Sequence, residues 1–168
     1  MKTLLKTLSF SLLIGASVSA NAQWNVSGGY SSLNEDIEAD DISLGAVYGS
    51  VGYTYDNDSL TFMPELRVGF GVGDDTVYGV DIEVDSLIVA SVRAQYNVNE
   101  KFGVFLQPSY GRLEATASAG GESVSEDDWE FGFGGGASFK VSDQVAIEAL
   151  YEAFDEVDVL SLGVRYSY

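Results

Sequence analysis

The sequence predicts an all-β fold, an eight-stranded antiparallel up-and-down transmembrane β-barrel. Apolar residues recur at every second position in about eight segments after residue 22, which is the period of a two-faced strand. The connectors between these segments alternate between mostly long, acidic stretches and short turns, as in a meander of hairpins. The apolar faces are also rich in bulky aromatic side chains, which suit a lipid-facing exterior.

Residues 1–22 have the features of a cleaved signal peptide. Lys2 and Lys6 accompany an apolar run over residues 8–18, which is shorter than the roughly 20 residues that a membrane-spanning helix needs. Ala20 and Ala22 supply small side chains at positions −3 and −1, so we expect cleavage after Ala22. Residues 23–168 then form one exported barrel domain.

The expected strands follow in order along the mature chain. The clearest lies at 60–72, where Leu66, Val68 and Phe70 share one face and Glu65 and Arg67 lie on the other. The full set is 23–33, 42–55, 60–72, 78–96, 102–113, 128–141, 144–154 and 158–168. Mostly long connectors are expected at 34–41, 73–79, 114–127 and 155–157, and short turns at 56–59, 97–101 and 142–143.

Two features disturb the strand pattern. In 42–55 the apolar residues change phase between Ala46 and Val51, and a bulge near Val47 would reconcile the two registers. Pro64 and Pro108 lie inside expected strands, and a closed barrel has no edge where a missing N–H is harmless. We therefore expect a bulge or a skipped ladder bond at each proline.

The size of the apolar side chains separates a membrane barrel from a soluble one. A soluble ligand-binding barrel would pack these apolar faces inside, but the interior of eight strands is already filled by side chains of ordinary size. The aromatic residues also form two groups separated by aliphatic positions, as at the two interfaces of a bilayer. The group near the short turns is Trp24, Tyr53, Tyr55, Phe62, Tyr96, Phe102, Phe139, Tyr166 and Tyr168, and the other is Tyr30, Phe70, Tyr110, Trp129, Phe131 and Tyr151.

Charged residues fall into two sets. Those near the long connectors are acidic, with only Arg112 opposing Glu35, Asp36, Glu38, Asp40, Asp41, Asp74, Asp75, Asp81, Glu83, Asp85, Glu114, Glu122, Glu126, Asp127, Asp128, Asp155, Glu156 and Asp158. The expected interior is neutral, with Glu65, Glu130, Glu148 and Glu152 against Arg67, Arg93, Lys140 and Arg165, as buried charge requires. We expect Glu65 to pair with Arg67, and Arg165 with Glu148 or Glu152.

Composition restricts the function. The net charge of −18 argues against a nucleic-acid partner, and the chain contains neither cysteine nor histidine. No catalytic residue, cofactor site or specific metal site is predicted, although the acidic loops could bind Ca²⁺ or Mg²⁺ loosely and bridge them to lipopolysaccharide. Residues 132–137 match a G-x-G-x-x-G/A nucleotide motif, but a strand is expected to follow where that motif needs a helix.

The signal peptide, the meander and the last strand together resemble the small eight-stranded outer-membrane barrels, such as OmpX-like proteins and the OmpA transmembrane domain. The most specific part of the resemblance is Ser161, Gly163, Tyr166 and Tyr168, a polar residue, a glycine and two alternate terminal aromatics. The resemblance implies a bacterial outer-membrane location, and that this strand is a recognition signal for the barrel-assembly machinery.

The expected function is that of a non-enzymatic outer-membrane barrel whose acidic extracellular loops serve envelope integrity or surface interactions. Its expected partners are outer-membrane lipids and lipopolysaccharide, with a monomer favoured. One alternative is a narrow channel for ions or small solutes, and another is a lipid-modifying outer-membrane enzyme. The absence of histidine disfavours the enzyme, because such nucleophiles generally use a histidine base.

Overall fold

The computed structural model describes residues 22–37, 40–57, 59–72, 74–77, 80–119, 122–155 and 157–168. The expected signal peptide therefore lies outside the described residues, apart from the backbone of Ala22, where the first strand begins. Among the described residues, no helix is long and apolar enough to cross a membrane.

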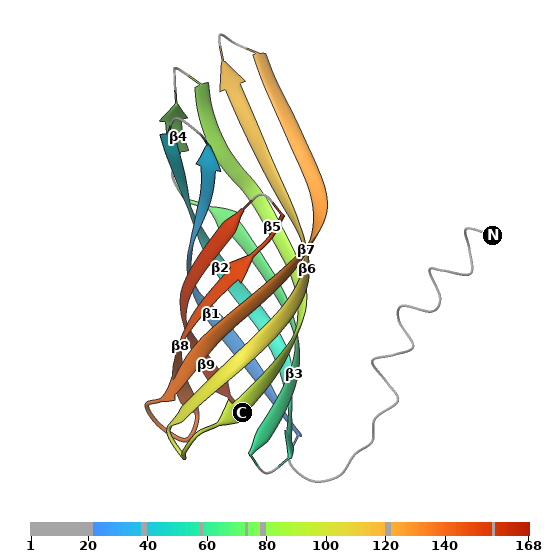
Figure 1. Ribbon diagram of the computed structural model, residues 1–168, viewed down its shortest axis with the longest axis vertical. Coiled ribbons are helices and arrows are strands. Elements are labelled where there is room, and N and C mark those ends of the chain that lie inside the picture. The colour runs from blue at the N-terminus through green and yellow to red at the C-terminus, as the bar shows by residue number, and fades with distance from the viewer. Residues whose placement is uncertain are drawn as a thin grey trace, which may run out of the picture.

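The described chain is built from antiparallel strands that wind steeply around a common axis (Figure 1). The strands are β1 (Ala22–Ile37), β2 (Asp40–Asn57), β3 (Leu60–Gly71), β4 (Asp74–Val77), β5 (Val80–Asn97), β6 (Phe102–Ala119), β7 (Glu122–Lys140), β8 (Val145–Ala153) and β9 (Asp158–Ser167). The strand order in the sheet is β3-β2-β1-β9-β8-β7-β6-β5-β4, and β3 also pairs with β5. The short β4 continues the course of β3 along β5, so the wall has eight strand positions.

The first and last strands close the barrel. β1 pairs with β9 from Asn25↔Ser167 to Asn34↔Asp158 without a break in register. Beyond this ladder, the backbone N–H of Tyr168 donates to the carbonyl of Trp24 at 3.0 Å. The predicted eight-stranded antiparallel up-and-down barrel is therefore confirmed.

Three of the predicted long connectors are mainly strand, which corrects the sequence prediction. The β6–β7 ladder runs to Ala119↔Glu122, and the β1–β2 ladder runs to Ile37↔Asp40. These hairpins rise well above the short β8–β9 hairpin in Figure 1. Residues 114–127 are acidic or small and lack the alternation of apolar side chains by which strands were predicted. Their backbone nevertheless continues to pair.

The irregular positions are resolved differently from each other. The β1–β2 register is continuous across Val47, so the expected bulge there is wrong. At Pro64 the paired residues on β2 skip from Gly52 to Tyr55, and at Pro108 the paired residues on β5 skip from Ser91 to Ala94. The skipped ladder contacts expected at both prolines are thus present, each on one side of the strand. One register shift, between Val84 and Ser86, was not predicted.

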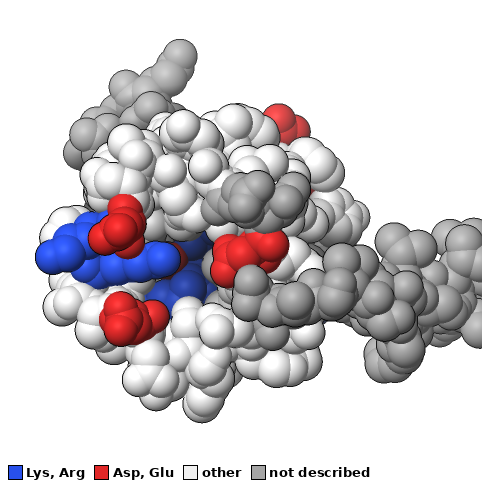
Figure 2. Space-filling view, turned by 90° about the horizontal axis from the view of Figure 1, so that it is seen from below, with Lys and Arg blue, Asp and Glu red and all other residues white. Residues whose placement is uncertain are grey.

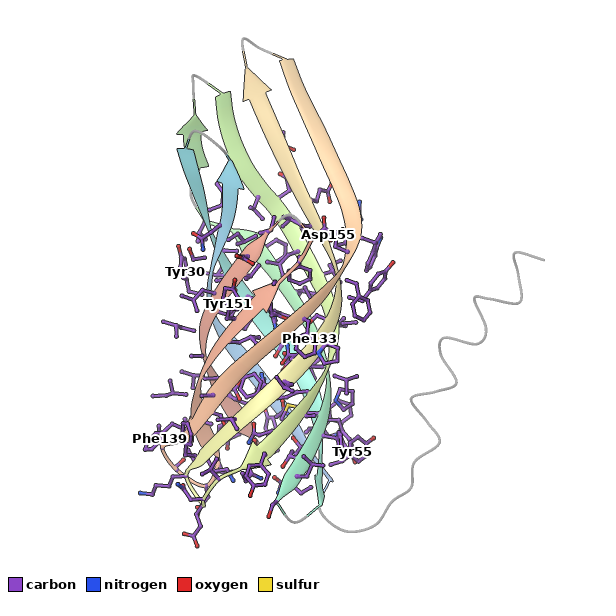
Figure 3. All side chains as sticks on the ribbon, in the orientation of Figure 1. Tyr30, Tyr55, Phe133, Phe139, Tyr151 and Asp155 are labelled. Carbon is purple, nitrogen blue, oxygen red and sulfur yellow. The ribbon has the colours of Figure 1, made fainter. Side chains whose placement is uncertain are left out.

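The outward face carries the bulky apolar side chains. Trp24, Phe131 and Tyr168 are 58%, 71% and 67% exposed. In Figure 3, Tyr55 and Phe139 lie toward the short-turn end, whereas Tyr30 and Tyr151 lie nearer the tall hairpins. This arrangement agrees with the two predicted aromatic belts. Large exposed apolar surface of this kind requires an apolar solvent around the wall.

Candidate functional site in the barrel interior

The interior is polar where a water-soluble protein would be apolar. Along β3 the outward side chains Phe62, Leu66 and Val68 alternate with the buried Glu65 and Arg67. The largest fully buried side chains include Arg93, Gln107 and Glu152. A charged group inside a barrel is stable only with partners that replace its water, so the contacts of these groups define the site.

Arg165 on β9 is the centre of one buried cluster. Its Nε donates to Oε1 of Glu148 at 2.8 Å, and Nη2 donates to Oε2 of Glu65 at 2.5 Å. Nη1 also donates to Oδ1 of Asn25 on β1. Arg93 joins this cluster by donating to Glu148 at 2.7 Å. Four strands other than β9 are thereby linked across the interior through a single guanidinium and its partners.

Glu152 on β8 is the centre of a second buried cluster. It accepts hydrogen bonds from Nη1 of Arg67 and from Oγ of Ser109, both at 2.6 Å, and a longer one from Gln107 at 3.4 Å. Arg67 also lies 3.9 Å from Glu65, which connects the two clusters. The three arginines thus face three glutamates, and the buried charge is balanced.

The predicted pairs are only partly those that form. Arg165 was predicted to pair with Glu148 or Glu152, and it pairs with Glu148. Glu152 instead pairs with Arg67, and the main partner of Glu65 is Arg165. Glu65 and Arg67, neighbours on β3, do form the predicted pair at 3.9 Å, but each also has a shorter ion pair with a residue of another strand. Strand tilt brings residues of distant strands to the same height inside the barrel.

Lys140 and Glu130 do not join the buried clusters. Lys140 is exposed at the end of β7, in the interior phase but beyond the enclosed part of the barrel. Glu130 is half-buried on the same strand and has an interaction of its own. Figure 2, which looks into the short-turn end, shows basic side chains reaching the centre of the mouth with acidic ones around them.

A buried apolar layer borders the charged clusters, with Val89 paired to Arg67 and Val159 paired to Glu152, and extends from there toward the tall hairpins. It consists of Leu33, Ala46, Val84, Leu87, Val89 and Val159, with Leu44, Leu113, Phe154 and Val157 packed against it. Leu33 is paired with both Leu44 and Val159, and Leu87 is paired with Leu113, so the layer spans the interior from wall to wall. The sequence does not predict this layer. Its one sign of it is that Leu44 and Ala46 lie in a different apolar phase from the rest of segment 42–55.

The glycines of β7 make room for side chains that cross the interior. A Cβ at Gly132 would lie 2.5 Å from the ring of Phe154, and one at Gly136 would collide with the ring of Phe105. The guanidinium of Arg93 sits 3.8 Å above the centre of that same Phe105 ring. The G-x-G-x-x-G/A segment is therefore part of a strand that packs against aromatic side chains, which rules out the nucleotide-binding reading.

The predicted assembly segment lies on the closing strand β9. Ser161 is buried and its Oγ lies 2.8 Å from that of Ser31, while Tyr166 and Tyr168 point outward and contact each other edge to face. Gly163 faces the interior, where a Cβ would collide with the hydroxyl of Tyr48. Each of these residues thus has a place in the folded barrel, and a signalling role remains a prediction.

The acidic residues near the hairpins form no group suited to a metal ion among the described residues. The side chains at 35–43, 73–83 and 117–128 lie outside the described part of the structure. Loose binding of Ca²⁺ or Mg²⁺ at the acidic loops therefore stays a prediction.

A closed β-barrel with an apolar exterior, two aromatic belts and a charge-balanced interior is a transmembrane β-barrel protein. The chain belongs to the outer membrane protein beta-barrel domain family, whose pattern matches residues 8–168. It is accordingly a protein of the bacterial outer membrane. Comparison with curated proteins finds no match.

Solved structures with the same fold include three small barrels. Ail, the attachment invasion locus protein of Yersinia pestis, aligns with a TM-score of 0.67 and 19% identity over 89% of this chain and 100% of that one. Neisserial surface protein A (NspA) gives 0.66 and 17% over the same shares. The N-terminal β-barrel domain of Pseudomonas aeruginosa OprF gives 0.59 and 12%, over 88% and 100%. At these identities the likeness establishes the fold.

Proposed function

We propose that this protein is a non-enzymatic surface barrel that binds cationic partners through its tall, acidic hairpins. The observation that carries the proposal is the unequal height of the wall. The β7–β8 ladder begins at Phe133↔Ala153, whereas β7 continues to Glu122 in its pairing with β6. The β6–β7 hairpin therefore projects beyond β8, with residues 122–132 unpaired on their β8 side within the described ladders.

The charge of this hairpin sets the chemistry of its partner. Within 122–130 the sequence places Glu122, Glu126, Asp127, Asp128 and Glu130, and no lysine or arginine. Ail has been crystallised with the heparin analogue sucrose octasulfate, a polyanion. The acidic hairpin end of the present chain would repel such a ligand, so the proposed partner has the opposite charge.

Two features support the proposal over a channel or an enzyme. The buried arginines and glutamates neutralise one another inside a barrel whose interior is filled by side chains, which opposes ion flow. The six described glutamate and arginine side chains in these clusters are committed to structural ion pairs, and the sequence contains no histidine to activate a nucleophile.

The remaining partners in the proposal are those of the membrane itself. The aromatic belts would contact outer-membrane lipids, and divalent ions would bridge the acidic hairpins to lipopolysaccharide, which gives the barrel a part in envelope integrity. The barrel-assembly machinery would act on β9 during biogenesis, and the barrel would work as a monomer.

The proposal is tested with an extended oligolysine peptide and the full barrel in lipid nanodiscs, by surface plasmon resonance at several salt concentrations. We expect salt-dependent binding that weakens in Glu126→Gln/Asp127→Asn. The matched control is Glu100→Gln/Asp143→Asn, which removes the same charge from exposed residues at the short-turn end. Equal binding by the two variants, or no binding by the wild type, would contradict the proposal.

A further inference from the structure

We propose that the apolar layer of the interior is the permeability barrier of this barrel, with Phe154 as its sealing residue. The inference goes beyond surface binding and concerns a different part of the molecule. It rests on the order of polar and apolar side chains along the interior axis, and on the contacts of Phe154.

From the short turns upward, the interior is first a chain of hydrogen-bonded polar groups. Gln95 donates to Asn97 at 2.8 Å, Asn97 donates to Thr61 at 3.1 Å, and Thr61 donates to Asp56 at 2.7 Å. Asp56 is exposed and Asn97 is half-buried, so this chain runs from solvent into the barrel. The charged clusters of Arg165 and Glu152 lie above it.

The polar interior is not fully satisfied by protein atoms. Nε of Arg67 and Oγ of Ser91 are buried and have no hydrogen-bond partner within the described part of the chain. A buried polar atom without a partner costs free energy, so such groups in folded proteins are usually hydrated. The polar part of the interior thus offers atoms to which water can bind, whereas the apolar layer above offers none among its buried side chains.

The layer above has the opposite chemistry. Leu33, Val84 and Leu87 are each buried, at 5%, 2% and 7% exposure, and the residues packed against them are also apolar. Ions and water cross an apolar constriction poorly because the layer offers no replacement for their hydration. The barrel interior is therefore apolar at this layer and mainly polar toward the short turns, where Met63, Phe105 and Leu150 are buried among the polar groups.

Phe154 closes the part of this layer where the wall is built from glycine. Its ring covers Gly132 on β7 and lies 3.6 Å from the position of a Cβ at Gly111 on β6. Its backbone N–H donates to the carbonyl of Val157 at 2.9 Å, which holds the main chain of the turn that follows β8. Truncating this ring removes the side chain that fills the space left by two glycines.

The absence of cysteine from the chain makes the barrier directly measurable. Ser91→Cys places one thiol below Val89 of the apolar layer and breaks no protein hydrogen bond. The barrel is inserted into sealed lipid vesicles with its hairpins outward, and a small membrane-impermeant cationic methanethiosulfonate reagent is added outside, so that it reaches the thiol only through the apolar layer. The rate of labelling is followed by mass spectrometry. We expect Phe154→Ala to accelerate labelling of this thiol by about tenfold or more, because buried sites otherwise react only through local opening.

Phe133→Ala is the matched control, since Phe133 is an outward-facing aromatic on β7. It should leave the labelling rate unchanged. If Phe154→Ala fails to give the heat-modifiable band of a folded barrel, Leu87→Ala thins the same layer from β5 and should accelerate labelling in its place. The proposal would be overturned if the thiol were labelled at the same rate with and without the substitution in the apolar layer, or if Phe133→Ala accelerated labelling equally.

Discussion

Replacing Arg165 with methionine should destabilise the barrel strongly. The change leaves Glu65 with only a 3.9 Å contact to Arg67, while Glu148 keeps its 2.7 Å bond to Arg93. Removing one partner of a buried ion pair typically costs about 3–5 kcal/mol, because the remaining charge is left without compensation. With a urea dependence of about 2 kcal/mol per molar, the unfolding midpoint should fall by roughly 2 M.

The measurement is equilibrium urea unfolding from lipid vesicles. Trp24 and Trp129 are both exposed on the outward face and report the loss of their lipid environment by fluorescence. Glu65→Gln in the Arg165→Met background should restore about 1 kcal/mol or more, since it removes the uncompensated charge.

Lys140→Met is the control for the same prediction. It removes one positive charge from the same interior phase, but from an exposed side chain, and should change stability by less than about 0.5 kcal/mol. The network interpretation would be refuted if Arg165→Met unfolded at the same urea concentration as Lys140→Met, or if Arg165→Glu were tolerated.

Three further predictions follow from the same structure. Gly132→Ala should destabilise the barrel by about 1–3 kcal/mol in urea unfolding, because its Cβ meets the ring of Phe154, whereas Gly135→Ala, whose Cβ contacts begin at 3.6 Å, should be nearly neutral. Deleting Tyr168 should reduce the heat-modifiable folded band in cell envelopes more than a one-residue deletion at a hairpin tip, because its N–H extends the closing ladder to Trp24; equal yields would contradict this. Chelation of divalent ions in lipopolysaccharide-containing membranes should lower barrel stability, and an unchanged melting temperature would count against ion bridging.

The strand positions and the orientation of the faces could be predicted because a half-buried strand has a period of two. Leu66 and Arg67, for example, fall on the faces that their side chains indicate. The pairs of Glu65 with Arg67 and of Arg165 with Glu148 could be predicted, but the shorter bond of Arg67 to Glu152 could not, because it crosses the interior and depends on strand tilt. Lys140 lies on the interior face, as predicted, but it is exposed at the open end of the barrel. The alternation of polar and apolar residues does not show where the enclosed part of a strand ends.

Neither the heights of the hairpins nor the buried apolar layer could be predicted from the pattern of polar and apolar residues. Ala115 and Ser125 lie in segments that pair through backbone groups, which every residue except proline supplies. Leu44 and Ala46 are apolar and point inward, as Leu33, Val89 and Val159 also do, against the prediction that apolar side chains face outward. A second apolar phase in one strand is ambiguous until neighbouring strands show that Leu33, Val159 and Leu87 lie at the same height.

The seam between β1 and β9 has a consequence for the order of folding. It joins residues as distant as Ser31 and Ser161, 130 positions apart, whereas most other ladders in the described barrel join strands that are consecutive in sequence. Loop-closure entropy and topology both delay contacts between distant segments, so the seam should be the last ladder to form. Until then the sheet has two open edges, and the time spent in that state decides whether the chain closes on itself or pairs with another strand.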